Sequence, residues 1–120
     1  SLEAMGDRAA GVALKREALD MRRRLYAGVD HPDLASSLRN IAISHLASGG
    51  ASAAAALLQE AVLMLMRLSP HRDDPDLAVT LYLFAMSLSQ SDDGQQRTSA
   101  RWVHTLAVDM AFRLVTIRFL

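Results

Sequence analysis

Apolar side chains recur along most of this 120-residue chain at steps of three and four positions, the spacing that gathers them on one face of an α-helix. Such stripes cover 33–48, 52–68 and 76–90, and each is followed by residues typical of turns. The pattern predicts one all-α domain over 8–120, with residues 1–7 as a cloning remnant or a disordered N-terminus. The five expected antiparallel helices cover 8–27, 32–48, 51–69, 75–90 and 97–118.

Two of the expected helices begin with the same signal. A Pro-Asp pair stands at 32–33 and again at 75–76. Proline lacks an N–H that the first helical turn does not need, and the aspartate places a carboxylate at the positive end of the helix dipole. The first of these helices should end at Gly49-Gly50 and the second at the turn 91–94.

The chain also contains an internal repeat. Pro-Asp-Leu-Ala at 32–35 recurs at 75–78, a shift of about 43 positions, and the flanking apolar positions follow the same shift. A second pattern occurs three times, and its last copy lies about three residues farther on, so we expect extra residues around 91–96. We name the helices that follow Pro-Asp A-type and the others B-type, which gives the order B-A-B-A-B. The second pattern consists of Ala18, Met21, Arg24 and Leu25, then Ala61, Met64, Arg67 and Leu68, then Ala107, Met110, Arg113 and Leu114.

This repeat resembles the tetratricopeptide repeat, and more narrowly the longer-period repeats of the kinesin light chain type. In that subtype a His-Pro-Asp precedes the first helix of each unit, as at 31–33 here, and Asn40 matches an asparagine that is frequent there. His45 and Ala51 stand where the family usually has aromatic residues. The resemblance implies stacked helical hairpins, an α-solenoid. The positions that follow the family consensus are Leu38, Ile41, Ala42, Gly49, Ala54, Leu58 and Ala61.

In this family the A-type helices line the concave side of the stack, where extended or helical peptides bind, so the resemblance implies a peptide groove on these helices. Arg39 and Asn40 are suited to hold a peptide backbone or an acidic side chain, beside an adaptable floor that includes Met86. The implied groove residues are Ser36, Arg39, Asn40, Ile43 and Leu46, and then Val79, Tyr82, Leu83 and Met86.

The last expected helix carries two apolar stripes. The stripe expected to enter the core consists of Val103, Leu106, Ala107, Met110, Ala111, Leu114 and Ile117, and the second consists of Val108, Phe112, Val115 and Phe119. Terminal helices of soluble arrays normally have a polar outer face. We therefore expect the second stripe to be covered by a following repeat, by a second copy of the chain or by a partner protein. We favour a longer array, of which an isolated piece would self-associate.

Charge and composition narrow the classes of partner. The chain has 13 basic and 13 acidic side chains, whereas binding to nucleic acid phosphates requires an excess of Lys and Arg on one face. No uninterrupted apolar stretch reaches the ~20 residues that cross a bilayer, so neither a nucleic acid nor a membrane is expected as a partner. The chain has no cysteine, so no oxidising compartment is implied, and we expect a cytoplasmic location.

No arrangement of polar residues predicts catalysis or metal binding. The four histidines lack the two-on-one-face spacing of a zinc site, and the carboxylates at 73–76 and 92–93 lack the ligand order of a calcium loop. The three arginines at 22–24 suit a helix C-terminus, where cations are favoured. We therefore expect structural roles for these side chains, no cofactor and no enzyme activity. The histidines are His31, His45, His71 and His104.

The resulting hypothesis is a non-catalytic scaffold that binds a peptide or a helical segment of another protein in a concave groove. One alternative is a regulatory segment of a multidomain enzyme or signalling ATPase, in which case the bound segment belongs to the same protein. Another is a helical dimerisation domain that works through the last helix.

Overall fold

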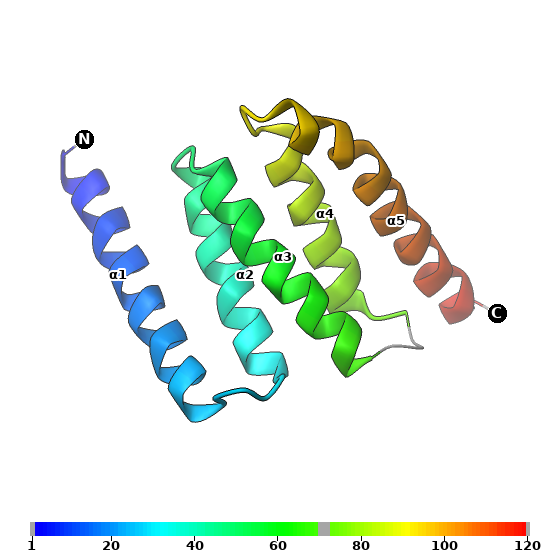
Figure 1. The fold of residues 1–120 in the computed structure, drawn as a ribbon, viewed down its shortest axis with the longest axis horizontal. Helices are drawn as coiled ribbons and strands as arrows, with labels where there is room; N and C mark the ends of the chain where they lie inside the picture. The colour runs from blue at the N-terminus through cyan, green and yellow to red at the C-terminus, as the bar shows by residue number, and fades with distance from the viewer. Residues whose placement is uncertain (1, 70–72, 120) are drawn as a thin grey trace.

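The computed structural model describes the backbone of residues 2–69 and 73–119, and the side chains of residues 9–69 and 73–116. Each of its helices packs antiparallel to the next, and the helices lie side by side in chain order (Figure 1). This arrangement confirms the expected all-α fold of sequential antiparallel pairs. The helices are α1 (Leu2–Leu25), α2 (Pro32–Ala47), α3 (Ala51–Leu68), α4 (Pro75–Ser89) and α5 (Gly94–Phe119).

The three central helices agree with the expected bounds to within one residue, but the two outer helices are longer than expected. Residues 2–7, expected to be a remnant or disordered, belong to α1, because Leu2, Ala4 and Met5 are strong helix formers. Helix α5 begins at Gly94 instead of residue 97. The Asp93 carboxylate accepts a hydrogen bond from the Gln95 N–H at 2.8 Å, so the extra residues of this unit extend the helix.

Both A-type helices are capped by the residue that precedes proline. In α2 the His31 Nδ1 atom accepts a hydrogen bond from the Asp33 N–H at 3.0 Å. In α4 the Asp74 carboxylate accepts the corresponding bond from the Asp76 N–H at 2.8 Å. A different residue type therefore satisfies the same free backbone donor in each repeat.

The core lies along the centre of the stack, where small and large side chains alternate. Ala42, Ala54 and Ala61 are fully buried at helix crossings, and Leu38 and Leu58 fill the spaces between the helices. Helix α3 is long and apolar enough, among the described residues, to cross a membrane. In this fold it packs against both α2 and α4, and this packing accounts for its apolar composition.

The stripe expected to bury α5 is only partly buried. Val103 and Ala107 lie in the core, and Met110 and Leu114 are half-buried. Leu106 and Ala111 were expected in the core and are exposed, which corrects the prediction, because α5 has one neighbouring helix and α3 has two. The side chain of Ile117 lies outside the described residues.

Candidate protein-interaction surfaces

The residues expected to line a peptide groove lie on the surface of α2 and α4, and all nine are outside the buried core. Leu46 and Leu83 pack at the edge of a small cluster formed by Ala42, Ala54 and Leu58. Each A-type helix thus buries one side in the core and exposes the other side to solvent. The exposed residues are Asn40, Ile43, Val79 and Tyr82, and the half-buried ones are Ser36, Arg39, Leu46, Leu83 and Met86.

Two of these residues contact neighbouring helices. The Arg39 guanidinium lies 3.6 Å from the Asp76 carboxylate, so part of its charge is already balanced by the first turn of α4. The Tyr82 ring lies 5.9 Å from the His104 ring on α5, at an interplanar angle of 49°. Asn40 makes no side-chain hydrogen bond to the part of the chain that the structure describes, and its exposed amide remains free to donate and to accept.

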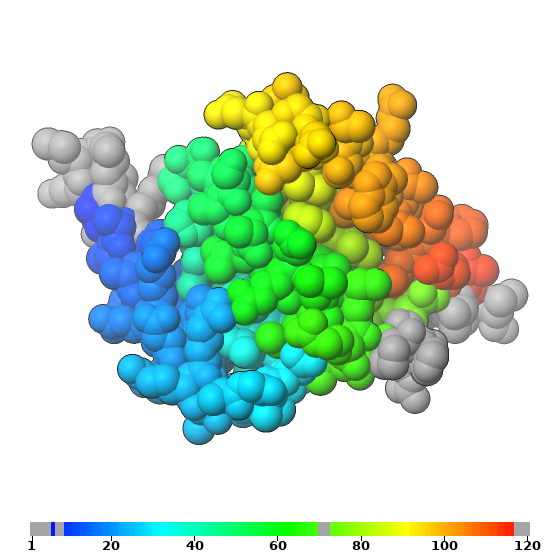
Figure 2. All heavy atoms as spheres, in the orientation of Figure 1, coloured from blue at the N-terminus to red at the C-terminus, as the bar shows by residue number. Residues whose placement is uncertain are grey.

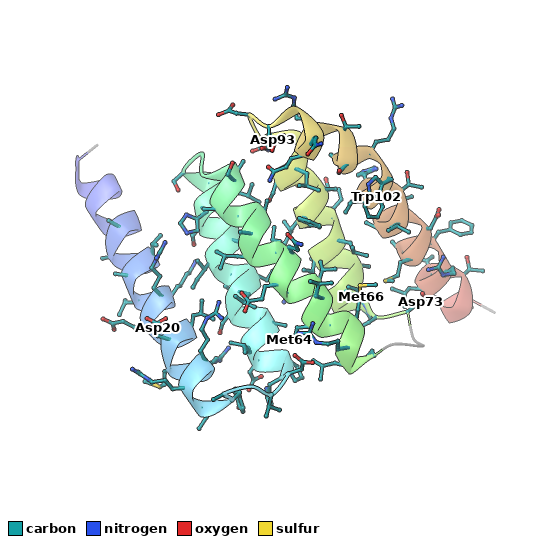
Figure 3. The ribbon with its side chains drawn as sticks, viewed as in Figure 1. Asp20, Met64, Met66, Asp73, Asp93 and Trp102 are labelled. Carbon is teal, nitrogen blue, oxygen red and sulfur yellow. The ribbon has the colours of Figure 1, made fainter. Side chains whose placement is uncertain are left out.

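A groove of about 760 Å³ lies between α3 and α5, with α4 as its floor. Figure 2 shows α4 in yellow-green between the green α3 and the orange α5. Met66 of α3 and Trp102 of α5 point into this space from opposite sides (Figure 3). We name it the α3–α5 groove. Its apolar lining includes Val62, Leu63, Met66, Leu77, Leu81, Phe84, Leu88, Trp102, Val103, Leu106 and Met110.

This groove was not predicted from the sequence. Helical periodicity assigned Leu106 to the core and gave no role to Trp102, yet 45% and 59% of these side chains, respectively, are exposed. A signal was available, because Trp102 lies outside both apolar stripes of its helix. A large aromatic residue outside the core stripe is typical of a surface that contacts another molecule.

A smaller pocket of about 330 Å³ lies near the C-terminal ends of α1 and α3. Two bidentate ion pairs border it. The Arg23 guanidinium donates to both Glu60 carboxylate oxygens at 2.8 and 2.9 Å, and Arg67 donates to both oxygens of Asp30 at 2.7 and 2.8 Å. The hydrogen bonds from Arg67 lower the pKa of the Asp30 carboxyl, and those to Glu60 raise the pKa of Arg23.

One of these ion pairs recurs in the next repeat. Arg113 of α5 donates to both oxygens of Asp73 at 2.9 and 3.0 Å, and these bonds lower the pKa of the Asp73 carboxyl. In both cases the arginine near the end of a B-type helix binds the aspartate in the loop before its A-type partner helix. We name these two ion pairs the repeat clamps. They give Arg67 and Arg113 a specific carboxylate partner.

The second stripe of α5 is exposed where it is described. The exposed fractions are 49% for Val108, 71% for Phe112 and 55% for Val115, and the side chain of Phe119 lies outside the described residues. The repeat aligns Val108 with Val62 of α3, which is only 5% exposed because α4 packs beside it. Equivalent positions are therefore covered on α3 and uncovered on α5.

The remaining polar residues singled out in the sequence form hydrogen bonds and stacking contacts within α1, α2 and the loop between them. His31 caps α2 and stacks on Tyr26, with ring centroids 3.8 Å apart, and His45 lies 3.3 Å from the Arg16 guanidinium. Arg22 donates to the Asp33 carbonyl and to the Ser37 hydroxyl, at 2.7 and 2.6 Å. Among the described residues, no three His, Asp or Glu side chains cluster in a way that could hold a metal ion. His71 lies outside the described residues.

Comparison with known proteins agrees with the order and packing of the helices. The tetratricopeptide repeat family matches residues 1–66, which include α1, α2 and most of α3. No curated protein matches the chain. Tetratricopeptide repeats generally mediate contacts between proteins, and the match covers more than half of the sequence. With its B-A-B-A-B order of antiparallel helices, the chain belongs to the tetratricopeptide repeat family.

Proposed function

We propose that this chain is a non-catalytic scaffold that binds a peptide or a helical segment of another protein across the exposed face of α2 and α4. The observation that supports this proposal is that none of the nine expected groove residues is fully buried, although Leu46 and Leu83 pack at the edge of the core. Large apolar side chains such as Val79 and Tyr82 are left on the surface beside the free amide of Asn40. This combination suits a partner that offers apolar side chains and unpaired backbone groups.

Asn40 and Arg39 differ in what they offer a ligand. The amide of Asn40 can bind a peptide N–H and C=O together, and its removal costs the fold little because the side chain is exposed. Arg39 has part of its charge balanced by Asp76. Binding of an acidic ligand residue therefore competes with an existing ion pair, and Asn40 is the better single test of the groove.

The test is a selection of peptides that bind the chain, followed by calorimetry of the selected peptide with purified variants. Asn40→Ala and Tyr82→Ala should each weaken binding about tenfold, the loss typical of a residue central to an interface. The free energy of unfolding should change by no more than about 0.5 kcal/mol. Arg39→Ala should also weaken binding, with up to about 1 kcal/mol of stability lost with its ion pair.

Met66→Ala is the matched control, because Met66 and Tyr82 are exposed to a similar extent, 51% and 46%, on different faces. It should leave this affinity unchanged. Unfolding of the domain by Asn40→Ala or Tyr82→Ala would place these side chains in the core and refute the groove. Equal binding by all variants would refute it as well.

We also propose a subtype of repeat and a cellular location for this chain. The His-Pro-Asp at 31–33 and Asn40 support a repeat of the kinesin light chain type. The absence of cysteine from the sequence supports a cytoplasmic location. If the chain instead regulates an adjoining enzyme or signalling ATPase, the same face of α2 and α4 binds a segment of that protein.

A second candidate function is association through α5, supported by the exposed Val108, Phe112 and Val115. Of these side chains, Val108 corresponds to Val62, which α4 covers on α3, whereas Phe112 corresponds to the exposed Met66. An A-type helix of a further repeat, or of a second copy of the chain, would cover Val108 in the same way. Concentration-dependent sedimentation tests this function.

A further inference from the structure

The two grooves between neighbouring B-type helices differ at one pair of equivalent positions. Between α1 and α3, the ion pair of Arg23 and Glu60 joins the two helices. The repeat places Met66 of α3 at the position of Arg23, and Leu106 of α5 at the position of Glu60. Charged partners in one groove are thus replaced by apolar side chains in the next.

The replacement leaves the α3–α5 groove apolar and open. Met66 is 51% exposed and Leu106 is 45% exposed, and Trp102 is 59% exposed on the same wall as Leu106. The groove is floored by α4 residues such as Phe84. An open apolar groove that is rimmed by polar side chains is typical of a binding site.

The walls match the side-chain spacing of a helix. On the α3 wall, Leu63 and Met66 stand three residues apart, and on the α5 wall, Trp102, Leu106 and Met110 follow one another at steps of four. Between two such ridges a third helix packs with its own apolar stripe at steps of three and four. The lining of the groove extends along α3 over 52–66, which corresponds to about 21 Å, or roughly four helical turns.

The charge of the groove is uneven. At one end lie the exposed carboxylates of Asp92 and Asp93, neither of which forms an ion pair with the part of the chain described here. The neighbouring Arg97 guanidinium donates to the Ser91 carbonyl at 2.9 Å. At the other end, Arg113 is held by both oxygens of Asp73. Of the two charged residues that line the groove, Arg113 is paired with Asp73, whereas Asp93, which caps α5, forms no ion pair with a described residue. The lining is therefore negative at the end marked by Asp93 in Figure 3.

We propose that the α3–α5 groove binds an amphipathic helix of a partner protein. The apolar stripe of that helix packs on Met66, Trp102 and Leu106, and a basic side chain at one end faces Asp92 and Asp93. This site is separate from the peptide-binding face of α2 and α4. One chain therefore offers two surfaces to two protein segments.

Trp102 makes the site directly measurable, because it is the single tryptophan of the chain and lies in the groove. The probes are synthetic 15-residue helical peptides without aromatic residues, with leucines at positions i, i+3, i+4 and i+7. Two versions carry lysines at the N-terminal or the C-terminal end, two carry glutamates there, and one has a scrambled leucine order. One lysine version should shift the Trp102 emission to shorter wavelength and bind at least about threefold tighter than its glutamate counterpart at low salt.

The decisive variant restores the ion pair of the first groove. Met66→Arg combined with Leu106→Glu should close the α3–α5 groove and weaken peptide binding at least about tenfold, while Trp102 is retained as the probe. Leu106→Ser alone is a milder second variant. Circular dichroism and urea unfolding of each variant verify that the fold is intact.

Asn40→Ala and Tyr82→Ala are the controls for the other face and should bind these peptides as the unmodified chain does. The proposal is overturned if no peptide shifts the emission, if the scrambled or glutamate peptides bind as tightly, or if the double variant binds unchanged. A loss of binding in the control variants would overturn it too, because the peptide would then occupy the face of α2 and α4. Failure of the proposed function on that face leaves these measurements unaffected.

Discussion

Single side chains in the loop before each A-type helix determine how that helix starts. His31 and Asp74 occupy equivalent positions, and each accepts a hydrogen bond from the N–H two residues later. His31 also stacks on Tyr26. The repeat therefore requires an acceptor at this position but does not require one residue type.

Replacement of His31 tests this interpretation. His31→Ala removes the acceptor and should lower the free energy of unfolding by about 1 kcal/mol. His31→Asp copies the cap of α4 and should keep most of that stability. Urea unfolding of the three proteins provides the comparison, and equal losses in both variants would assign the effect to the lost Tyr26 stacking instead.

At the scale of the element, the repeat clamps join each B-type helix to the loop before its partner. The pKa values of Asp30 and Asp73 are lowered in the folded chain by hydrogen bonds from Arg67 and Arg113. A carboxyl group with a lowered folded pKa contributes stability above its unfolded pKa, about 3.9 for aspartate. That contribution is lost as the pH falls through the folded value.

The lowered pKa values of Asp30 and Asp73 predict how the stability of two variants depends on pH. Asp30→Asn combined with Asp73→Asn should lower the melting temperature at neutral pH. Below about pH 4 the difference from the unmodified chain should shrink towards zero, because protonation removes the same charges. Thermal unfolding between neutral and acidic pH measures it. A difference that stays constant across this range would show that the clamps act through packing and not through charge.

The local signals of the elements could be predicted from the sequence. Pro-Asp pairs and Gly49-Gly50 mark helix ends within a few residues, and the duplicated Pro-Asp-Leu-Ala shows the order of the helices. The predicted start of α5 at residue 97 was wrong because Gly94 is typical of a turn. In the structure Asp93 caps the helix, so Gly94 is its first residue.

Whether a neighbouring helix buries a given helix face could not be predicted from these local signals. Periodicity assigns Leu106 to a face of α5, but it does not determine whether a neighbouring helix reaches that face. The α3–α5 groove arises from the spacing of two helices that are not consecutive in the chain. Only the aligned pairs Arg23–Glu60 and Met66–Leu106 reveal the difference between the grooves, and Arg23 and Glu60 become visible as a pair once the fold is known.

Across the stack of five helices, the burial of large apolar side chains decreases from the centre to both ends. On α1 the large side chains of Leu14, Met21 and Leu25 are exposed, and on α5 those of Val108, Phe112 and Val115 are exposed. In the part of the chain that the structure describes, the backbone of α1 packs closely on α2 alone and that of α5 on α4 alone. Such end faces tend to bind further helices.

Association through α5 has a direct test. The isolated chain should self-associate in sedimentation experiments at tens to hundreds of micromolar, and Phe112→Ser should weaken association by about tenfold without changing stability. Leu14→Ser is the matched control, because Leu14 is 67% exposed at the opposite end and Phe112 is 71% exposed. A chain that stays monomeric throughout, or a control variant with the stronger effect, would contradict the role of α5.

The second repeat clamp and the extra residues of the last unit lie at opposite ends of the α4–α5 hairpin. The Arg113–Asp73 pair holds the end where α4 begins, whereas the longer turn and the Asp93 cap lie where α4 leads into α5. A unit of this design can therefore vary in length at one end while the other end stays fixed.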